Sequence, residues 1–523
     1  MSDDRQHIEP SATRRAGRRE WIGLAVIALP GLLYAMDLTV LFLAVPALTR
    51  ELDPSSSQLL WITDIYGFLI AGLLVTMGTL GDRIGRRRLL MWGAAAFGAA
   101  SVIAAFSTSA EMLIAARAAL GIAGATLAPS TLSLISNMFA DPRQRTFAIG
   151  VWATSYSVGA AIGPLVGGLL LEHFWWGSVF LLAVPVMVLL LAVGPRLLPE
   201  FRDPSPGRFD LPSAGLSLVA VLTTVYGIKH LATHGPGTTA VVTIAAGLAV
   251  GAVFIRRQRT IADPLIDLGL FRAPAFSTAL AANTLGIFIA GGVFLFIAQY
   301  LQLVLGMGPL EAGLWTLPSA GAFIVGSMLA PVAVRFLGPS QVVAGGLALA
   351  AAGLAVLTQV GAGSGLAVLV IGSVVIDLGL ALAVTLGTDL IVGAAPPERA
   401  GAASAVSETG AELGGALGVA VLGSIGTAIY RGGVADAVPG DVPAAAAEAA
   451  RDTLGGAVGA ADQLPAGVLQ AAGEAFTHGF QVSAGLTAGL ALAVAAATAV
   501  IMRRRGGRGA EPAHAAGVAP AEC

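Results

Sequence analysis

The segment Gly78–Arg88 reads GTLGDRIGRRR and joins two apolar stretches that are each long enough to cross a bilayer. It places Asp82 and four arginines in a short turn that also contains glycines. Such a basic turn stays on the cytoplasmic side of a membrane, because arginine resists translocation. A loop that only fixed the topology would need the arginines, but neither the glycines nor Asp82. The whole pattern therefore predicts a transporter, in which the glycines let two helices approach and Asp82 pairs with an arginine of its own loop.

The composition excludes a soluble globular protein. Of the 523 residues, 56% are hydrophobic and only 11% are charged, whereas a soluble domain carries roughly 25% charged residues. Lipid offers no partner to backbone polar groups, so the spans should all be helical. We therefore expect an all-α polytopic membrane protein. At about 20 apolar residues per span, fourteen transmembrane helices are predicted near 21–45, 59–80, 89–107, 112–136, 147–171, 177–194, 213–232, 239–255, 275–303, 310–333, 341–359, 366–391, 402–430 and 479–502.

The distribution of the 29 basic residues supports this topology. With both termini in the cytoplasm, 24 of the 29 fall in cytoplasmic segments. Arg117 and Lys229 lie in or at the end of spans, and the remaining three, Arg50, Arg431 and Arg451, fall on the outer side, as the positive-inside rule requires. The basic N-terminal tail runs straight into a long apolar stretch without a small-residue cleavage site, so no cleaved signal peptide is expected.

A faint internal repeat divides the chain into two halves. Spans 1–6 match spans 9–14 through residues that recur at offsets of 252 to 254, namely Arg83, Gly85, Pro142, Arg145 and Ala148 with Arg335, Gly338, Pro396, Arg399 and Ala402. Such repeats usually place a binding cavity between the halves at the bilayer midplane. Spans 7 and 8 lie outside the repeat, and we expect them to form an inserted hairpin that faces lipid and is dispensable for the chemistry.

The predicted organisation follows from this repeat. A cytoplasmic tail (1–20) precedes an N-terminal six-helix bundle (21–196), a linker with the two extra helices (197–274), a C-terminal six-helix bundle (275–502) and a second cytoplasmic tail (503–523). The long outer loop 431–477 contains Pro443 and Pro465 at plausible first positions of helices. It predicts a short helical hairpin over the extracellular mouth, with disorder as the alternative.

Ionisable residues within spans are costly and are therefore functional candidates. Even the lenient insertion scale assigns about 2.5–3.5 kcal/mol to each. The candidates for proton coupling and substrate binding are Asp37, Asp64, Arg117, Asp377, Glu408 and Glu412. Glu408 and Glu412 are four residues apart and so share one helical face.

Carboxylates in a cavity of this kind have two compatible uses. Desolvation and a neighbouring like charge both favour the protonated form, and a deprotonated carboxylate binds a cation. Competition between a proton and a cationic substrate is sufficient for antiport. A purely structural role, bonded to a neighbouring helix, remains the alternative for each acid and carries most weight for Asp64 and Asp377. Arg117 must be paired, either in a proton relay or in a fixed structural ion pair.

Aromatic and small residues complete the candidate site. Ring faces attract cations, and the aromatic candidates are Tyr34, Trp61, Tyr66, Trp152, Tyr156 and Tyr300. In span 5, Gly159, Gly163 and Gly167 form one stripe that permits close helix approach. Pro164 within the stripe predicts a kink.

Together these motifs resemble the major facilitator superfamily. The segment GTLGDRIGRRR is similar to its cytoplasmic-loop motif, and Arg117 within ARAALGIAGA is similar to its fourth-span motif. The glycines and Pro164 of VGAAIGPLVGG resemble the fifth-span antiporter motif. Three further features resemble the fourteen-span drug:proton antiporters, the quaternary-ammonium efflux pumps of the QacA, SmvA and LfrA type. They are the segment from Asp37 to Pro46, the run WITDIYGFLIAG at 61–72, and the two span-13 glutamates, Glu408 and Glu412.

The resemblance implies the major facilitator fold, with two six-helix bundles and two inserted central helices. It also implies roles for individual residues. These are proton coupling and cation binding at Asp37, Glu408 and Glu412; coupling at Arg117; a gating motif of Gly78, Asp82, Arg83, Gly85 and Arg86; and an antiporter motif of Gly159, Gly163, Pro164, Gly167 and Gly168. One departure concerns span 10, which has no internal acid and carries only Glu311 at its outer edge. Some relatives use an acid there for divalent cations, so tight handling of dications is in doubt.

The expected function is proton-coupled export of lipophilic cationic drugs, dyes and quaternary ammonium antiseptics across a bacterial cytoplasmic membrane. A dedicated exporter of an endogenous secondary metabolite is the nearest alternative. A membrane enzyme or receptor is the alternative from another class, but the sequence shows no nucleophile, metal or phosphate motif for it. Protons, lipophilic cationic small molecules and the lipid bilayer are the expected partners of a monomer, and we expect no cofactor, metal or nucleic acid.

Overall fold

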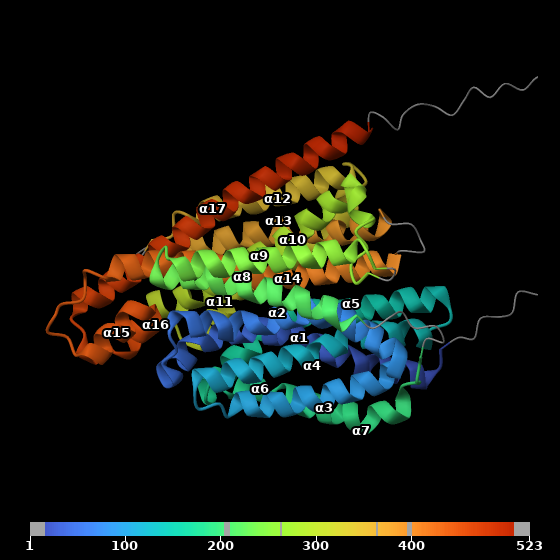
Figure 1. The fold of residues 1–523 in the computed structure, drawn as a ribbon, viewed down its shortest axis with the longest axis horizontal. Helices are drawn as coiled ribbons and strands as arrows, with labels where there is room; N and C mark the ends of the chain where they lie inside the picture. Colours follow the sequence, from blue (N-terminus) through green and yellow to red (C-terminus); the bar gives the residue numbers. More distant parts are fainter. Residues whose placement is uncertain (1–15, 203–209, 262–263, 362–364, 395–399, 507–523) are drawn as a thin grey trace, which may run out of the picture.

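The computed structural model describes residues 16–202, 210–261, 264–361, 365–394 and 400–506, and its described part is helical without strands (Figure 1). Fourteen of its helical segments are long and apolar enough to cross a membrane, which confirms the predicted number. The predicted tails lie largely outside the described residues, as do Pro396 and Arg399 of the repeat.

The helices follow one another with short connections. Their bounds are α1 Arg18–Leu52, α2 Ser56–Ile84, α3 Arg86–Ala105, α4 Ala110–Met138, α5 Pro142–His173, α6 Ser178–Leu181, α7 Ala183–Leu197, α8 Leu211–His234, α9 Thr238–Gln258, α10 Pro274–Gln299, α11 Pro309–Ala333, α12 Pro339–Leu357, α13 Gly365–Gly393, α14 Ala400–Val434, α15 Ala444–Asp452, α16 Leu454–Gly459 and α17 Ala466–Gly506.

The two halves have largely separate apolar cores. One buried cluster is built from α1 to α7 alone, and the largest other cluster is centred on α10 to α17. The helix starts also obey the repeat: Gly85 caps the N-terminus of α3, and Gly338 caps that of α12. Gly85 has a φ of 112°, a backbone conformation that a side chain would strain.

The halves meet along two pairs of helices, α2 with α14 and α5 with α11. We call the end of the molecule that carries α15 and α16 the loop end, and the end where α1 begins and α17 finishes the termini end (Figure 1). Two hydrogen bonds join the halves at the loop end. Ser56 donates to the carbonyl of Asp452 (2.9 Å), and Gln302 donates to that of Leu43 (3.0 Å). The halves are therefore fastened together at the loop end.

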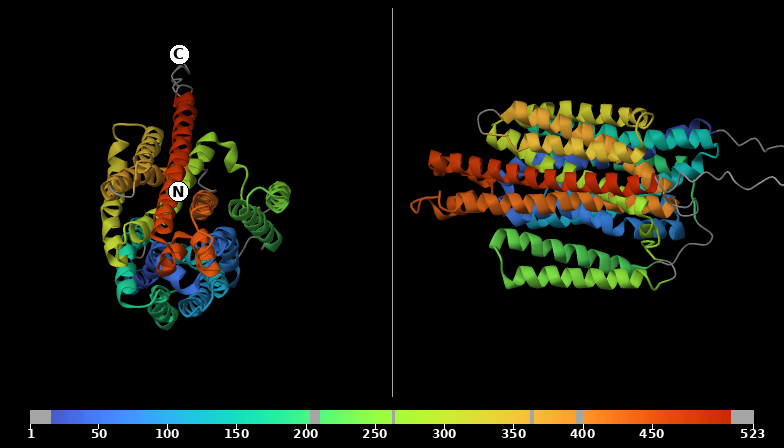
Figure 2. Two further views of the ribbon diagram at one scale, coloured as in Figure 1. Left: turned by 90° about the vertical axis from the view of Figure 1, so that its left-hand side faces the viewer. Right: turned by 90° about the horizontal axis from the view of Figure 1, so that it is seen from above.

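The inserted helices α8 and α9 form a hairpin at the side of the molecule (Figure 2). Most of α9 is exposed, as expected for a lipid-facing helix, but α8 packs against both α2 and α14. The expectation that both helices simply face lipid is therefore wrong for α8. At the termini end of the hairpin, Asp210 accepts hydrogen bonds from the backbone N–H of Ser213 in α8 and from Nη2 of Arg257 in α9. Burial by itself would raise the pKa of Asp210, but the hydrogen bonds from Ser213 and Arg257 outweigh it and hold that pKa below its usual range.

The outer loop differs from its prediction in one respect. A helix does begin directly after Pro443, and α15 and α16 form a compact pair at the loop end. Pro465, however, precedes the first residue of α17, which continues without a break for 41 residues to Gly506. No proline interrupts the sequence between those points, so the expected second loop helix is the outer extension of the last span.

The contact between α1 and α5 yields a test of the packing. A Cβ built on Gly159 would lie 2.2 Å from the Leu32 carbonyl oxygen, whereas one built on Gly150 of the same helix would meet nothing within 4 Å. We expect Gly159→Ala to destabilise the protein by roughly 1–3 kcal/mol, the usual range for overpacking. Gly150→Ala should leave stability unchanged or slightly higher. Thermal unfolding in detergent measures both, and equal midpoints would contradict this packing.

Candidate functional site

An ion pair lies inside the N-terminal half. Arg117 of α4 is fully buried, and its Nη1 donates to Oδ2 of Asp37 on α1 at 2.6 Å. Its Nε donates to the carbonyl of Ile62 on α2 at 3.2 Å. Arg117 is thus paired, as its sequence position required, with a carboxylate and with a backbone carbonyl. The pair connects three helices within the span region.

Close helix packing fixes the position of Asp37. The glycine stripe of α5 lies against α1: a Cβ on Gly163 would be 2.2 Å from Thr39 Oγ1, and one on Gly167 would be 2.5 Å from Val40. Any larger side chain in the stripe would push α1 and Asp37 away from Arg117. Helices α4 and α2 are similarly close, because a Cβ built on Gly121 of α4 would lie 2.8 Å from the Tyr66 carbonyl oxygen.

The other residues of the fifth-span motif face the opposite half. A Cβ on Gly168 would lie 2.8 Å from the Pro309 carbonyl oxygen of α11, and one on Gly313 of α11 would lie 2.4 Å from the Pro164 carbonyl oxygen. One helix therefore uses one set of small residues to hold Asp37 and another to contact the C-terminal half.

Aromatic rings cover the ion pair. Arg117 lies over the Tyr66 ring at 4.5 Å, and the Tyr66 and Tyr34 ring centroids are 5.9 Å apart. Tyr34 lies 5.8 Å from Tyr156, which makes an edge contact of 4.9 Å with Trp152. Four of the six aromatic candidates thus form one cluster. The structure places Trp61 beside α8 instead, and Tyr300 is buried, donating to the Gly361 carbonyl at 2.7 Å.

The glutamates approach this cluster from the C-terminal half. Glu408 and Glu412 lie on α14, close enough to interact electrostatically with each other. Tyr34 and Tyr156 are each within electrostatic range of both glutamates. The tyrosines therefore lie between the Asp37–Arg117 pair of one half and the two carboxylates of the other.

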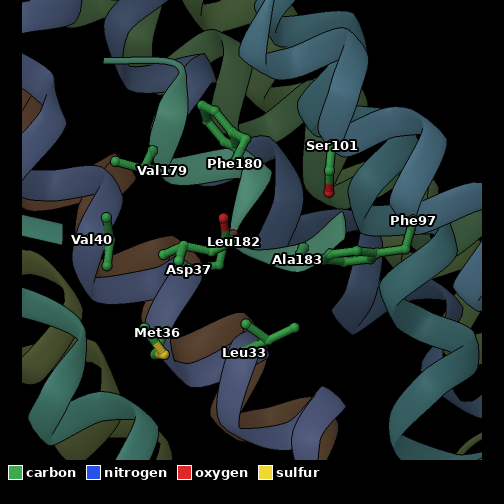
Figure 3. Close-up of a pocket in the computed structure, with 10 residues that line it drawn as sticks. All are labelled: Leu33, Met36, Asp37, Val40, Phe97, Ser101, Val179, Phe180, Leu182 and Ala183. Carbon is green, nitrogen blue, oxygen red and sulfur yellow. The ribbon is translucent and has the colours of Figure 1, made fainter. Parts of the chain in front are cut away.

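A small cavity adjoins Asp37 (Figure 3). Its volume is about 20 Å³, which is room for about one water molecule. Asp37 is the charged residue in a lining otherwise made mainly of apolar side chains, among them Leu33, Phe97 and Phe180. The Asp37 side chain stays 17% exposed, so a water molecule can reach it.

Two predicted acids lie apart from this cluster. Lys229 of α8 holds Asp64, with Nζ 2.9 Å from Oδ1 and 2.8 Å from Oδ2. Asp377 of α13 lies beside Ser319 of α11. Sequence reasoning missed Lys229 as a partner, although a signal existed, since it is the single lysine of an arginine-rich chain.

The gating motif is held within the N-terminal half. Asp82 accepts from Arg86 Nε at 2.8 Å and from its Nη2 at 2.6 Å, and Arg86 also donates to the Pro129 carbonyl at 3.3 Å. Glu200, which follows α7, accepts from the backbone N–H of Arg87 at 3.1 Å. This carboxylate fixes the turn between α2 and α3.

Fourteen membrane-spanning helices in two packed halves, with a charged and aromatic cluster between them, define a solute transporter. The family model of the Major Facilitator Superfamily matches residues 27–419, and the chain belongs to this superfamily. The multidrug efflux pump LfrA of Mycolicibacterium smegmatis is 45% identical over 497 residues, 94% of this chain and 98% of LfrA.

Two further similarities agree with this assignment. The methyl viologen resistance protein SmvA of Salmonella typhimurium is 37% identical over 88% of this chain and 93% of SmvA. The crystal structure of a bacterial homolog of the human lysosomal transporter Spinster superposes with a TM-score of 0.65, covering 94% of this chain and 98% of that one. Its identity of 19% makes that likeness one of fold alone.

The gating motif gives a prediction that separates turnover from binding. Asp82 lies in the last turn of α2 at the termini end, away from the aromatic cluster, so Asp82→Asn should impair transport more than substrate binding. We expect unchanged binding of a fluorescent substrate together with reduced efflux. Glu51→Gln, which changes an exposed acid, serves as the control. Lost binding in a folded Asp82→Asn protein would contradict a gating role.

Proposed function

We propose that this transporter exports lipophilic monovalent cations in exchange for protons. The observation that carries the proposal is the position of the tyrosine cluster, between the Asp37–Arg117 pair of one half and the two glutamates of the other. Aromatic faces and carboxylates are the groups that bind a desolvated organic cation. The N-terminal half supplies the tyrosines and the C-terminal half supplies the glutamates, so a movement of one half against the other would change the site.

The exchange follows from competition for the same carboxylates. A bound cation favours the ionised acids, and a proton neutralises them and weakens cation binding. Arg117 provides Asp37 with a partner when the cation is absent. Departure of the cation would then let the acids take up protons, and the next cation would displace those protons. The scheme needs no chemistry beyond proton transfer and ion pairing.

The proposed orientation rests on the positive-inside distribution. Both termini would be cytoplasmic in a bacterial inner membrane, so the loop end would face outward. The hydrogen bonds that join the halves lie at the loop end. The outer side would then be closed in this conformation, and substrate would enter from the cytoplasmic side. Alternating access would then require these contacts to break.

The names of the relatives support the substrate class. One is a multidrug efflux pump and another a methyl viologen resistance protein. Methyl viologen is a dication, whereas α11 in this chain carries its acid, Glu311, in the first turn and not in its interior. We therefore confine the proposal to monovalent cations such as ethidium and quaternary ammonium compounds.

Asp37→Asn tests the coupling. The substitution removes the carboxylate of α1 and leaves Arg117 buried without its anionic partner. Proton-driven extrusion of ethidium should be abolished, while the amount of protein in the membrane is retained. The measurement is dye efflux from everted vesicles with and without a pH gradient, and Asp436→Asn, a change at an exposed acid, is the control. Efflux at the wild-type rate would refute the role of Asp37.

Glu408 and Glu412 give a second test. Two ionised carboxylates four residues apart in a span would repel each other, so at least one should be protonated in the empty site. Binding of a monovalent cation should then release a proton, detected as acidification of a weakly buffered solution of purified protein. The release should fall in the Glu408→Gln, Glu412→Gln double variant and persist in Glu311→Gln. Undiminished release in the double variant would assign coupling to Asp37 and leave the glutamates a packing role.

A further inference from the structure

The inserted helix α8 is fastened to the N-terminal half by a buried ion pair. The side chains of Lys229 and Asp64 are 1% and 0% exposed, and Lys229 Nζ contacts both carboxylate oxygens. The same ammonium lies 3.6 Å above the Trp61 ring. A lysine and an aspartate at this depth are each unfavourable alone and tolerable together. Separating α8 from α2 would therefore leave two unpaired charges in an apolar environment.

The same face of α8 also reaches α14, because Val225 precedes Lys229 by one helical turn, but the contact there is of another kind. Val225 packs in a small cluster with Ala416 and Ala420 of α14 and with Phe68 of α2. In the described parts of α8 and α14, no hydrogen bond or ion pair is recorded between the two helices. The α14 side of this contact is apolar and consists of Leu413, Ala416, Leu417 and Ala420. Such a surface can slide without breaking a directional interaction.

Helix α8 also covers the seam at which the halves meet. A Cβ on Gly67 of α2 would lie 3.2 Å from that of Ala416 and 3.9 Å from the carbonyl oxygen of Glu412. The seam thus runs beside the residues of the proposed substrate site. Figures 1 and 2 show the hairpin along the outside of the blue α2 and the orange α14.

The hairpin itself is a stiff unit. A Cβ built on Gly227 of α8 would lie 2.9 Å from the backbone nitrogen of Ile244 in α9. One built on Gly247 of α9 would lie 2.7 Å from the backbone nitrogen of Thr224 in α8. Arg257 of α9 pairs with Asp210 at 2.9 Å where α8 begins. A force applied to α8 is therefore transmitted to the whole hairpin.

We propose that the Lys229–Asp64 pair anchors the inserted hairpin to the N-terminal half, so that α8 moves with α2 and slides over α14 as a lateral seal of the seam. Lys229 and Asp64 are positioning residues in this scheme and do not contact the substrate. The proposal rests on the relative movement of the two halves during transport, and does not depend on which cation is carried. It assigns the hairpin a task in transport, in contrast to the expectation that it is dispensable.

Cysteine pairs in a Cys523→Ser background test which contact must remain mobile. Gly72 and Leu218 join α2 to α8, and a Cβ on Gly72 would lie 2.3 Å from the Leu218 side chain. Val225 and Ala420 share the cluster between α8 and α14. Oxidative cross-linking of the Gly72→Cys, Leu218→Cys pair should leave efflux unchanged. Cross-linking of the Val225→Cys, Ala420→Cys pair should stop efflux until a reductant restores it.

Either opposite result overturns the proposal: a block by the first cross-link, or continued transport with the second. Cross-linking rates can also be compared in the presence and absence of a pH gradient without any substrate. The rate should respond to the gradient for the α8–α14 pair but not for the α2–α8 pair. This comparison distinguishes a failure of the anchor from a wrong choice of substrate.

The ion pair itself is tested by charge variants within the Gly72→Cys, Leu218→Cys background. Lys229→Met alone leaves Asp64 unpaired, and the protein can fail to fold. The neutral double variant Asp64→Asn, Lys229→Gln avoids this problem and should cross-link more slowly. The exchanged pair Asp64→Lys, Lys229→Asp should recover the rate. An unchanged rate in the neutral variant would refute the anchor and reduce the pair to a local packing feature.

Discussion

The ion pair between Arg117 and Asp37 is the interaction on which the arrangement of the N-terminal half depends. A guanidinium fully enclosed among helices is unfavourable unless it is paired with a carboxylate or with backbone carbonyls. Arg117 finds these on α1 and α2, which fixes α4 against both helices. The tyrosine cluster forms around that charge because Arg117 lies over the Tyr66 ring. A movement that weakened the pair would change both the available carboxylate and the aromatic surface beside it.

Glycine makes this arrangement geometrically possible. The stripe of α5 allows the α1 backbone to come close enough for Asp37 to reach Arg117, and Gly121 does the same for α2 against α4. In a bilayer no hydrophobic force drives helices together, so close packing of small residues supplies the contact. The same helix α5 also meets α11 through Gly168. Packing that positions the acid is thereby mechanically linked to the contact between the halves.

Helix α8 of the inserted hairpin makes two kinds of contact. Directional, charged contacts tie it to α2, and apolar contacts face α14. Burial of a charge pair is weak evidence for stability, but it specifies which surfaces belong together. Seen in this way, Asp64 has a partner of its own and stands apart from Asp37, Glu408 and Glu412.

The sequence by itself determined the number of spans, the glycine stripe of α5 and the identity of the ionisable residues within spans. These follow from local rules: a bilayer requires about 20 apolar residues per helix, and a charge within a span is too unfavourable to be incidental. Only the tertiary structure decided which charge meets which. Asp37 and Arg117 are 80 residues apart, and Asp64 and Lys229 are 165 apart. Such pairs depend on which helices pack side by side. The apolar pattern along a single helix in lipid does not specify its neighbouring helices.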